Sequence, residues 1–298
     1  MEFKDGEHFV KALEAFALND DLIKAHNAGN STYTMGHNAY THMTLEQFHK
    51  HFKLGKEIEI VKKGSKVFKP MLGAKVADAV DWVVEKKVTS VKNQGQCGSC
   101  WSFSTTGSLE GAYAIANDKD ASSWDGFSEQ MLVDCDTTDQ ACNGGLMDNA
   151  FEWITGNGGI CSESDYPYTS GTGVVGSCST ACTVIEGSAP TTFTDVMETE
   201  EALMQAVAQQ PVSVAIQANQ IAFQAYSGGV LTGKCGTRLD HGVLVVGYGT
   251  YTDGTDYWKV KNSWGETWGD EGYILIERGS SQRGGECGIL KMASFPTV

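Results

Sequence analysis

Histidine is almost absent from the last three quarters of this chain. Of its seven histidines only His241 lies beyond Val76, so residues 76–298 contain a single imidazole. Imidazole is the usual general base for activating a weak nucleophile near neutral pH. If this part of the chain is an enzyme that needs such a base, His241 is the one candidate. A lone histidine packed in a core is the plainer interpretation, and other motifs must decide between the two.

The chain also lacks long apolar runs and an excess of basic residues. No stretch has the roughly 18 consecutive apolar residues typical of a membrane-spanning helix. The first ten residues alternate charges with single aromatics, which is not the pattern of a secretory signal peptide. The formal net charge of −15 argues against nucleic acid and anionic membranes as partners. We expect neither kind of partner, no metal or other cofactor, and a monomer.

Arginine, tryptophan and cysteine are all missing from residues 1–75. The 11 Lys and 9 Asp/Glu of this leader give +2, which leaves −17 for residues 76–298. We therefore predict a basic, histidine-rich leader followed by an acidic body. The body contains all nine cysteines, a density typical of secreted or lysosomal proteins. Because nine is odd, complete pairing leaves one thiol over, although spacing alone does not reveal which one.

Apolar periodicity predicts mainly helices first and strands later. In the leader, Phe9, Leu13, Phe16 and Ile23 lie at helical spacing and predict an amphipathic helix over residues 5–27. A capping box at Thr44 predicts a second helix, and the Lys-rich residues 64–73 look like an exposed linker. In the body we predict helices over residues 101–116, 146–154 and 200–209, and strands over residues 212–216, 243–246, 257–261 and 273–276. This order indicates an α+β enzyme with a helical lobe (about 76–185), a β-rich lobe (about 186–298) and a cleft between them.

Cys97 and Cys100 form a C-x-x-C pair that is open to three interpretations. A redox dithiol expects a βαβ context, which is absent, and a zinc site needs a second suitably spaced pair, which the Cys178/Cys182 spacing does not supply. A nucleophile beside a structural cysteine has a physical basis, because Cys100 falls at the start of a predicted helix. Free N–H groups and the positive end of the helix dipole favour a thiolate there. The same N–H groups, with the side-chain amide of Gln94, are placed to stabilise an oxyanion.

Four motifs in order resemble the papain family of cysteine proteases, in particular a proenzyme of the cathepsin L type. They are Gln94–Ser104, the run that begins at Cys142, the Asp-His-Gly around His241, and the Asn-Ser-Trp-Gly that begins at Asn262. The resemblance implies a two-lobe papain-like fold and a cysteine endopeptidase. It implies Cys100 as nucleophile, His241 as base and then acid, Asn262 as the residue that orients the imidazole, Gln94 with the Cys100 amide as oxyanion hole, and Trp264 as a shield over the His241–Asn262 contact.

The resemblance also implies disulfide pairs and a specificity pocket. Three family pairs map to Cys97–Cys142, Cys135–Cys178 and Cys235–Cys287. We expect Cys161–Cys182 as an extra pair, with a swap of Cys178 and Cys182 left open. Gly144 and Gly145 would let an extended peptide approach closely. The pocket for the substrate residue second from the cut, on its N-terminal side, maps to Leu146, Met147, Ala215, Leu239, Gly242 and Met292. These residues are apolar or small, so we predict Leu, Phe or Val there, and not Arg.

The leader resembles the helical inhibitory propeptide of the same family. Phe16, Asn19, Ile23 and Asn27 fit the later part of its helix pattern, although two earlier positions depart from it. The resemblance implies that the segment after the leader helices crosses the cleft backwards, and that the mature enzyme begins near Val76. The six leader histidines suggest acid activation, but they could equally be solvated and silent.

Two rival functions remain at this point, together with questions of location. The chain could be a catalytically dead binding protein, or a thiol oxidoreductase that uses Cys97 and Cys100. An exopeptidase of the cathepsin B type is disfavoured, because it needs histidines that residues 76–298 do not contain. We expect a secreted or lysosomal/vacuolar protein, and a glycosylation sequon at Asn30 would be used if the protein is secreted.

Overall fold

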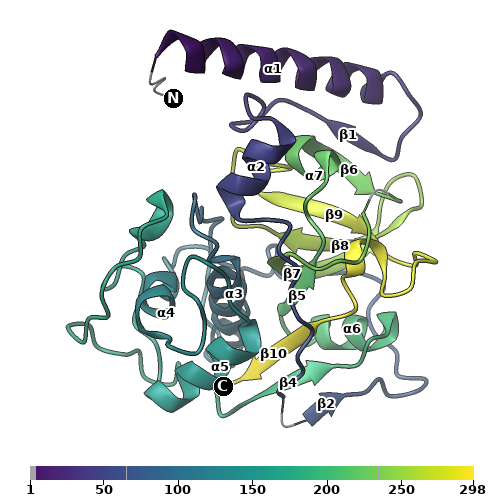
Figure 1. Ribbon diagram of the computed structural model, residues 1–298. Coiled ribbons are helices and arrows are strands. Elements are labelled where there is room, and N and C mark those ends of the chain that lie inside the picture. Colours follow the sequence, from purple (N-terminus) through teal and green to yellow (C-terminus); the bar gives the residue numbers. More distant parts are fainter. Residues whose placement is uncertain (1–4, 65, 234) are drawn as a thin grey trace.

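The computed structural model describes residues 5–64, 66–233 and 235–298, and a single curved sheet dominates it (Figure 1). The strand order is β1-β6-β9-β8-β7-β5-β10-β4-β2, with β3 paired to β7. The helices are α1 (Gly6–Asn27), α2 (Leu45–Phe52), α3 (Cys100–Ala116), α4 (Glu129–Cys135), α5 (Met147–Asn157), α6 (Glu200–Val207) and α7 (Ile221–Ala225). The strands are β1 (Tyr33–Met35), β2 (Lys66–Phe68), β3 (Val80–Asp81), β4 (Thr192–Val196), β5 (Val212–Ile216), β6 (Tyr226–Leu231), β7 (His241–Thr250), β8 (Asp256–Lys261), β9 (Tyr273–Glu277) and β10 (Ala293–Thr297).

Two apolar cores lie on either side of a cleft. One packs α3, α4 and α5 around Trp101, Leu109 and Phe151, and the other fills the sheet around Trp258, Trp264 and Trp268. The predicted order of helices followed by strands is confirmed, and the strands over 212–216, 243–246, 257–261 and 273–276 are all present. Within the described residues, no helix is both long and apolar enough to span a bilayer.

The leader contributes both outer strands of the sheet. β1 pairs antiparallel with β6, and β2 pairs parallel with β4 at the opposite end. The predicted exposed linker over 64–73 is therefore wrong in part, since Lys66–Phe68 is a strand. Its backbone finds hydrogen-bond partners on β4, a pairing that no local pattern in a Lys-rich segment signals. Covering both edges also blocks them as templates for other strands.

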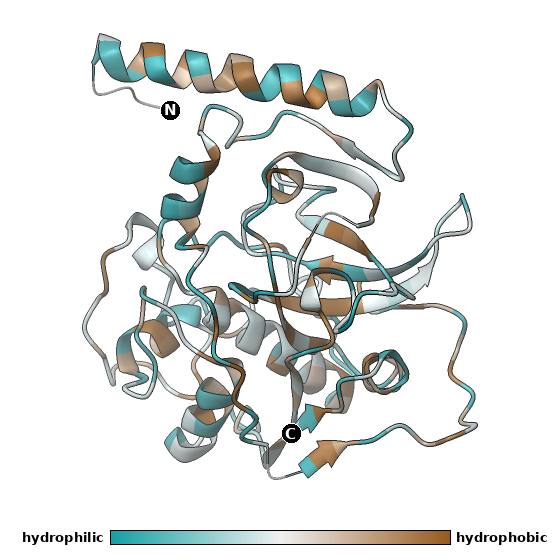
Figure 2. Cartoon of the chain, turned by 45° about the vertical axis from the view of Figure 1, so that its right-hand side comes forward, coloured by the Kyte–Doolittle hydropathy of each residue, from teal (hydrophilic) through white to brown (hydrophobic). Residues whose placement is uncertain are grey.

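Helix α1 exists as predicted, but of its predicted apolar face only Ile23 is buried. Ala12, Ala15, Asn19 and Ile23 are buried, whereas Phe9, Leu13 and Phe16 are 40% or more exposed. Hydrophobic and hydrophilic residues alternate along this helix (Figure 2). Asn19 Nδ2 donates to the carbonyls of Thr41 and Met43, each at 2.8 Å. Ala12 and Ala15 allow α1 to come close enough for these bonds, while Phe9, Leu13 and Phe16 stay exposed.

Candidate active site

Cys100 lies at the first position of α3, at the mouth of the cleft. A tight turn precedes it, in which a Cβ at Gly98 would meet the Cys142 carbonyl oxygen at 2.6 Å. The Cys97–Cys142 disulfide fixes this turn to the loop that carries Gly144. Cys100 is partly exposed and is the only cysteine without a disulfide in the part of the chain that the structure describes. With Cys97 in a bridge, Cys97 and Cys100 are no dithiol, which removes the oxidoreductase interpretation.

His241 begins β7, and Asn262 directly follows β8, the strand paired with it. His241 Nε2 lies 2.7 Å from Asn262 Oδ1. The same Oδ1 accepts the Ser263 backbone N–H at 2.8 Å, so the amide oxygen faces both donors. Nε2 is therefore the protonated nitrogen of a neutral ring, and Nδ1 carries the lone pair. His241 is fully buried, and its Nδ1 has no protein hydrogen-bond partner.

Gly242 brings β7 against the start of α3. A Cβ at Gly242 would meet both the Cys100 carbonyl oxygen and the Met147 sulfur at 3.3 Å. The Gly242 backbone N–H is also among the groups that lower the pKa of the Cys100 thiol. Gly242, the residue next to His241, thus contacts Cys100, although the two are 142 positions apart in the chain.

Burial keeps both reactive groups neutral in this structure. It raises the pKa of Cys100 to about 11, against the opposing effect of nearby backbone N–H groups. It lowers the pKa of His241 to about 4, despite the hydrogen bond that Nε2 donates to Asn262. Desolvation penalises the charged form of each group, so the covered site disfavours a thiolate–imidazolium pair.

Trp264 covers His241 and is itself covered by the leader. Its ring stacks on the imidazole with centroids 4.7 Å apart and on Phe52 with centroids 4.5 Å apart. Phe48 packs edge-on against the same ring, and Tyr40 Oη donates to the Trp264 carbonyl at 2.8 Å. These three leader aromatics are buried. The leader therefore docks directly on the residue that shields the histidine.

Gln94 is held by two hydrogen bonds at the base of the cleft. Ser263 Oγ donates to its Oε1 at 2.7 Å, and its Nε2 donates to the Cys97 carbonyl at 2.9 Å. This fixes the amide orientation, and Nε2 keeps a second hydrogen. Ser263 and Tyr168, whose Oη donates to the Gln94 carbonyl at 2.9 Å, were not singled out from the sequence. Ser263 lies inside the Asn-Ser-Trp-Gly motif, which could have signalled it, whereas Tyr168 lies in no such run.

Leader residues 52–59 lie across the cleft. Of these, residues 52–53 and 56–59 line a cavity of about 320 Å³ together with Cys100, Gly144 and Gly145. The Gly55 backbone N–H donates to Asp240 Oδ2 at 3.1 Å, and the Ile58 N–H donates to the Leu239 carbonyl at 2.7 Å. The leader therefore covers the place where a substrate would have to lie.

The residues predicted to form the specificity pocket come together around Ile58. Met147, Ala215, Leu239 and Met292 belong to one buried apolar cluster, Leu146 packs on it, and so does Ile58 from the leader. Asp139 was missed by the sequence analysis. Its Oδ1 accepts the Leu146 N–H at 3.0 Å, and burial raises its pKa to about 7.

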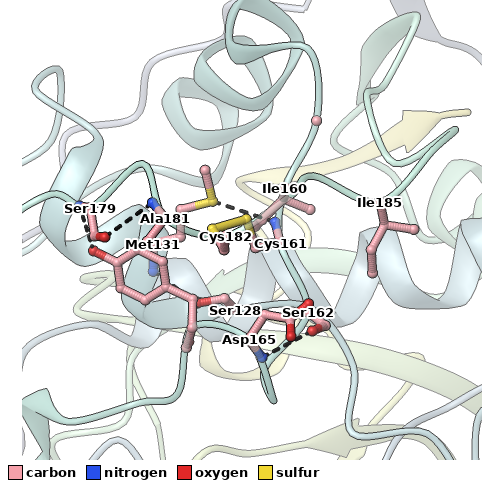
Figure 3. The surroundings of a disulfide bond; sticks show 12 residues. Ser128, Met131, Ile160, Cys161, Ser162, Asp165, Ser179, Ala181, Cys182 and Ile185 are labelled. Carbon is pink, nitrogen blue, oxygen red and sulfur yellow. Dashed lines mark hydrogen bonds between the residues drawn. A yellow bond between two sulfur atoms is a disulfide. The ribbon is translucent and has the colours of Figure 1, made fainter.

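Four disulfides join the same pairs as predicted: Cys97–Cys142, Cys135–Cys178, Cys161–Cys182 and Cys235–Cys287. The extra pair closes a loop of 21 residues in the helical lobe. Figure 3 shows this disulfide beside Met131, whose sulfur accepts the Cys161 N–H at 3.4 Å. The swap of Cys178 and Cys182 that the sequence left open does not occur.

Comparisons with known proteins agree with this architecture. The model of the "Papain family cysteine protease" matches residues 76–297, and that of the "Cathepsin propeptide inhibitor domain (I29)" matches residues 1–48. The senescence-specific cysteine protease SAG39 of Oryza sativa subsp. japonica is 41% identical over 303 residues, covering 99% of this chain and 86% of that protein. Vignain of Ricinus communis is 54% identical over 227 residues, covering 74% of this chain and 60% of that protein.

Solved proenzymes share the fold. The ragweed pollen cysteine protease Amb a 11 in its proform matches with a TM-score of 0.85 and 37% identity, over 99% of this chain and 89% of that one. Digestive procathepsin L2 from Tenebrio molitor matches with a TM-score of 0.89 and 34% identity, over 100% and 96%. Fold and cleft thus define a cysteine endopeptidase covered by its own propeptide. The chain belongs to the papain family of cysteine proteases.

Proposed function

We propose that Cys100, His241 and Asn262 catalyse peptide hydrolysis once the leader is gone. The observation that carries this proposal is the 2.7 Å contact of His241 Nε2 with Asn262, which leaves buried Nδ1 as the one ring nitrogen able to take the Cys100 proton. Removing the leader would readmit water and reverse the burial that keeps both groups neutral. The helix N-terminus at Cys100 then favours the thiolate.

The reaction runs in two halves. Cys100 Sγ attacks the substrate carbonyl, the oxyanion is held by the Cys100 N–H and Gln94 Nε2, and His241 protonates the leaving amine. Water, deprotonated by His241, then hydrolyses the thioester and restores the thiol. Asn262 keeps the imidazole in the required tautomer throughout, and Trp264 excludes water from their hydrogen bond.

We propose an apolar preference for the substrate residue second from the cut. Its support is the occupant of the proposed pocket, since the leader itself packs the apolar Ile58 there. No carboxylate lies at Met292 to pair with an arginine. Gly144 and Gly145 line the neighbouring cavity, and Gly144 adopts φ +111°, a conformation that side chains disfavour.

The order of leader contacts supports a reversed chain direction. Going from N- to C-terminus, the leader packs Phe52 on Trp264, then bonds Gly55 to Asp240 and then packs Ile58 into the proposed pocket. A substrate whose pocket residue precedes the scissile bond fills the pocket first and reaches Cys100 afterwards. The opposite direction keeps leader carbonyls out of register with Cys100, so the leader inhibits without being cut there.

We propose that acid loosens the leader through His42 and His51. Burial lowers the pKa of each, and they line one cavity of about 350 Å³ with His8, Lys50 and Lys53, with no carboxylate among its described lining residues. A docked leader therefore binds fewer protons than a released one, and docking weakens as pH falls through the ordinary histidine value of 6.5.

Several further assignments belong to the same proposal. Residues 1–75 form the inhibitory leader and residues 76–298 the peptidase domain. The enzyme acts as a monomer on peptide and protein substrates in a secreted or vacuolar compartment, which four disulfides favour. Asn30 is exposed and accessible to glycosylation.

One labelling experiment tests the catalytic assignment. The full chain is incubated at acid pH and treated with a peptidyl epoxide that carries Leu in the pocket position. We expect one label per molecule, on Cys100, and loss of all peptidase activity. A processed chain that takes up no label, or that keeps its activity when labelled, refutes the assignment, and the former result would favour a catalytically dead binding protein.

A further inference from the structure

In the linker between β2 and β3, the side chain of Leu72 lies in solvent. Leu72 is 91% exposed, more than any other large apolar side chain that the structure describes. Its neighbour Met71 is 71% exposed. Burying a leucine side chain stabilises a fold by about 1.5–3 kcal/mol, and the exposed Leu72 does not contribute this stabilisation to its own fold. The side chain is accessible to the pocket of another molecule.

Leu72 and Gly73 form the tip of a turn with fixed ends. The Ala74 N–H donates to the Met71 carbonyl at 3.1 Å, and Gly73 has φ +75°. Gln205 on α6 holds the Met71 backbone through both its N–H (2.9 Å) and its carbonyl (3.1 Å). Exposed loop tips of this kind are preferred sites of proteolytic cleavage.

We propose that the Gly73–Ala74 bond is the first bond cut during activation of this proenzyme, with Leu72 in the apolar pocket. The inference rests on the proposed function, because it uses the pocket preference for an apolar residue second from the cut. Gly73 then lies beside Cys100 and brings no side chain that could clash. The cut frees a product that begins at Ala74 and carries two leader residues, Ala74 and Lys75, ahead of the peptidase domain.

Neighbouring bonds fit less well. A cut after Leu72 would place Met71 in the pocket, but both backbone groups of Met71 are held by Gln205. A cut after Ala77 would use Val76, which is partly buried, and the Ala77 carbonyl accepts a hydrogen bond from Tyr248 at 3.2 Å. Of Met71, Leu72 and Val76, Leu72 needs the least rearrangement to enter the pocket of another molecule.

The geometry assigns this cut to a second molecule. In Figure 1 the linker passes α6 on the outside of the β-rich lobe, and Met71 is fixed there. The described residues that line the cavity at Cys100 include leader residues 52–53 and 56–59 and none from the linker. The proenzyme's own cleft is thus filled while its linker is exposed elsewhere. An enzyme molecule that has lost its leader must supply the nucleophile.

The step is an ordinary hydrolysis. The thiolate of Cys100 in the active molecule attacks the Gly73 carbonyl carbon, and the bond to the Ala74 nitrogen breaks as His241 protonates that nitrogen. Water then attacks the thioester, which leaves Gly73 as a carboxylate and returns the proton to the Cys100–His241 pair.

The test uses the full chain carrying Cys100→Ala as substrate, which cannot cut itself, and acid-activated wild-type enzyme. N-terminal sequencing of the first product is expected to give Ala74. In the same background, Leu72→Asp is expected to slow this cut at least about tenfold, because a carboxylate would be buried unpaired in the pocket. Leu72→Phe keeps the rate within about threefold. Ala77→Asp adds the same charge to the same linker and serves as the matched control, with no comparable slowing expected.

The outcomes separate this inference from the proposed function. A first product with another N-terminus, or an unchanged rate in Leu72→Asp, overturns the assignment of the bond even when the enzyme cleaves synthetic peptides with Leu in the pocket position. Failure to cleave those peptides as well overturns the proposed specificity itself. For wild-type proenzyme alone, a first-cut rate constant that does not change on dilution refutes cleavage by a second molecule.

Discussion

Replacing Phe52 with Ala is expected to open the covered cleft at neutral pH. Phe52 is 1% exposed and stacks on Trp264, while its edge contacts Tyr40, Phe48 and His51. The stacking on Trp264 and the burial of Phe52 against the core of the sheet are lost when the leader leaves the cleft, whereas Tyr40, Phe48 and His51 leave together with Phe52. Truncation of a buried phenylalanine destabilises by about 3–5 kcal/mol. Part of this loss falls on contacts inside the leader, and about 1.4 kcal/mol is tenfold, so the open population should rise about 10- to 10³-fold.

The assay follows labelling of Cys100 in the full chain at pH 7.5. The reagent is a peptidyl epoxide with Leu in the pocket position, which needs the space that Ile58 occupies and so reacts with the open form. Its labelling rate should rise in proportion to the open population. Leu18→Ala serves as control, because Leu18 is 65% exposed on α1 and its loss is expected to change the rate about twofold or less.

A labelling rate in Phe52→Ala within threefold of wild type would falsify the view that aromatic docking on Trp264 keeps the cleft closed. Thermal unfolding of the same variant must accompany the measurement. A variant that unfolds globally at the assay temperature would label without selectivity for Cys100, and peptide mapping of the labelled sites detects this.

Further predictions concern the hydrogen bond between His241 and Asn262, acid activation, the specificity pocket and the Cys161–Cys182 disulfide. Asn262→Ala should lower kcat at least about tenfold, with a smaller change in KM, because the imidazole loses its 2.7 Å anchor. His51→Gln should move the midpoint of acid activation to lower pH, since it removes a group that takes up a proton on leader release. Met292→Glu should raise kcat/KM for substrates with Arg in the pocket position relative to Leu. Replacing Cys161 and Cys182 together with Ala should lower the free energy of unfolding by about 3 kcal/mol, from the chain entropy of a loop of 21 residues, as measured by denaturant unfolding.

Each of these has an outcome that contradicts it. Unchanged kinetics in Asn262→Ala, or an unshifted midpoint in His51→Gln, would remove the role assigned to that side chain. Retained selectivity against Arg in Met292→Glu would mean that position 292 does not reach the pocket. If the double alanine variant is as stable as the parent, the neighbouring disulfides already restrict the unfolded chain and the Cys161–Cys182 bridge adds no further restriction.

Local chemistry explains what could be predicted from the sequence. Cys100 at a helix start, the single histidine of the body and the asparagine motif each need particular residue types at particular positions, so the side chains themselves indicate the chemistry. The helices and strands of the body follow from apolar periodicity. Asp139 and Tyr168 escaped prediction because their roles depend on distant partners, Leu146 for the one and Gln94 for the other.

The leader shows the limit of periodicity most clearly. Its first helix has large apolar residues at helical spacing, yet apart from Ile23 the structure buries smaller ones, because close approach lets Asn19 bond to two backbone carbonyls. Strand β2 forms in a Lys-rich segment because a free edge of β4 supplies its hydrogen bonds. An edge partner of this kind is invisible in a local pattern.

The amino-acid sequence by itself determined the reactive groups of this protein and the family whose order of motifs it shares, since both depend on residue identity and spacing. Only the tertiary structure decided which groups are charged and which are reachable. It buries His241 and covers Cys100 with a leader whose aromatics dock on Trp264, and desolvation disfavours the charged form of each group. It also leaves Leu72 in solvent, because the turn between β2 and β3 is held to α6 through Met71 while the Leu72 side chain points away from every apolar cluster of the described residues.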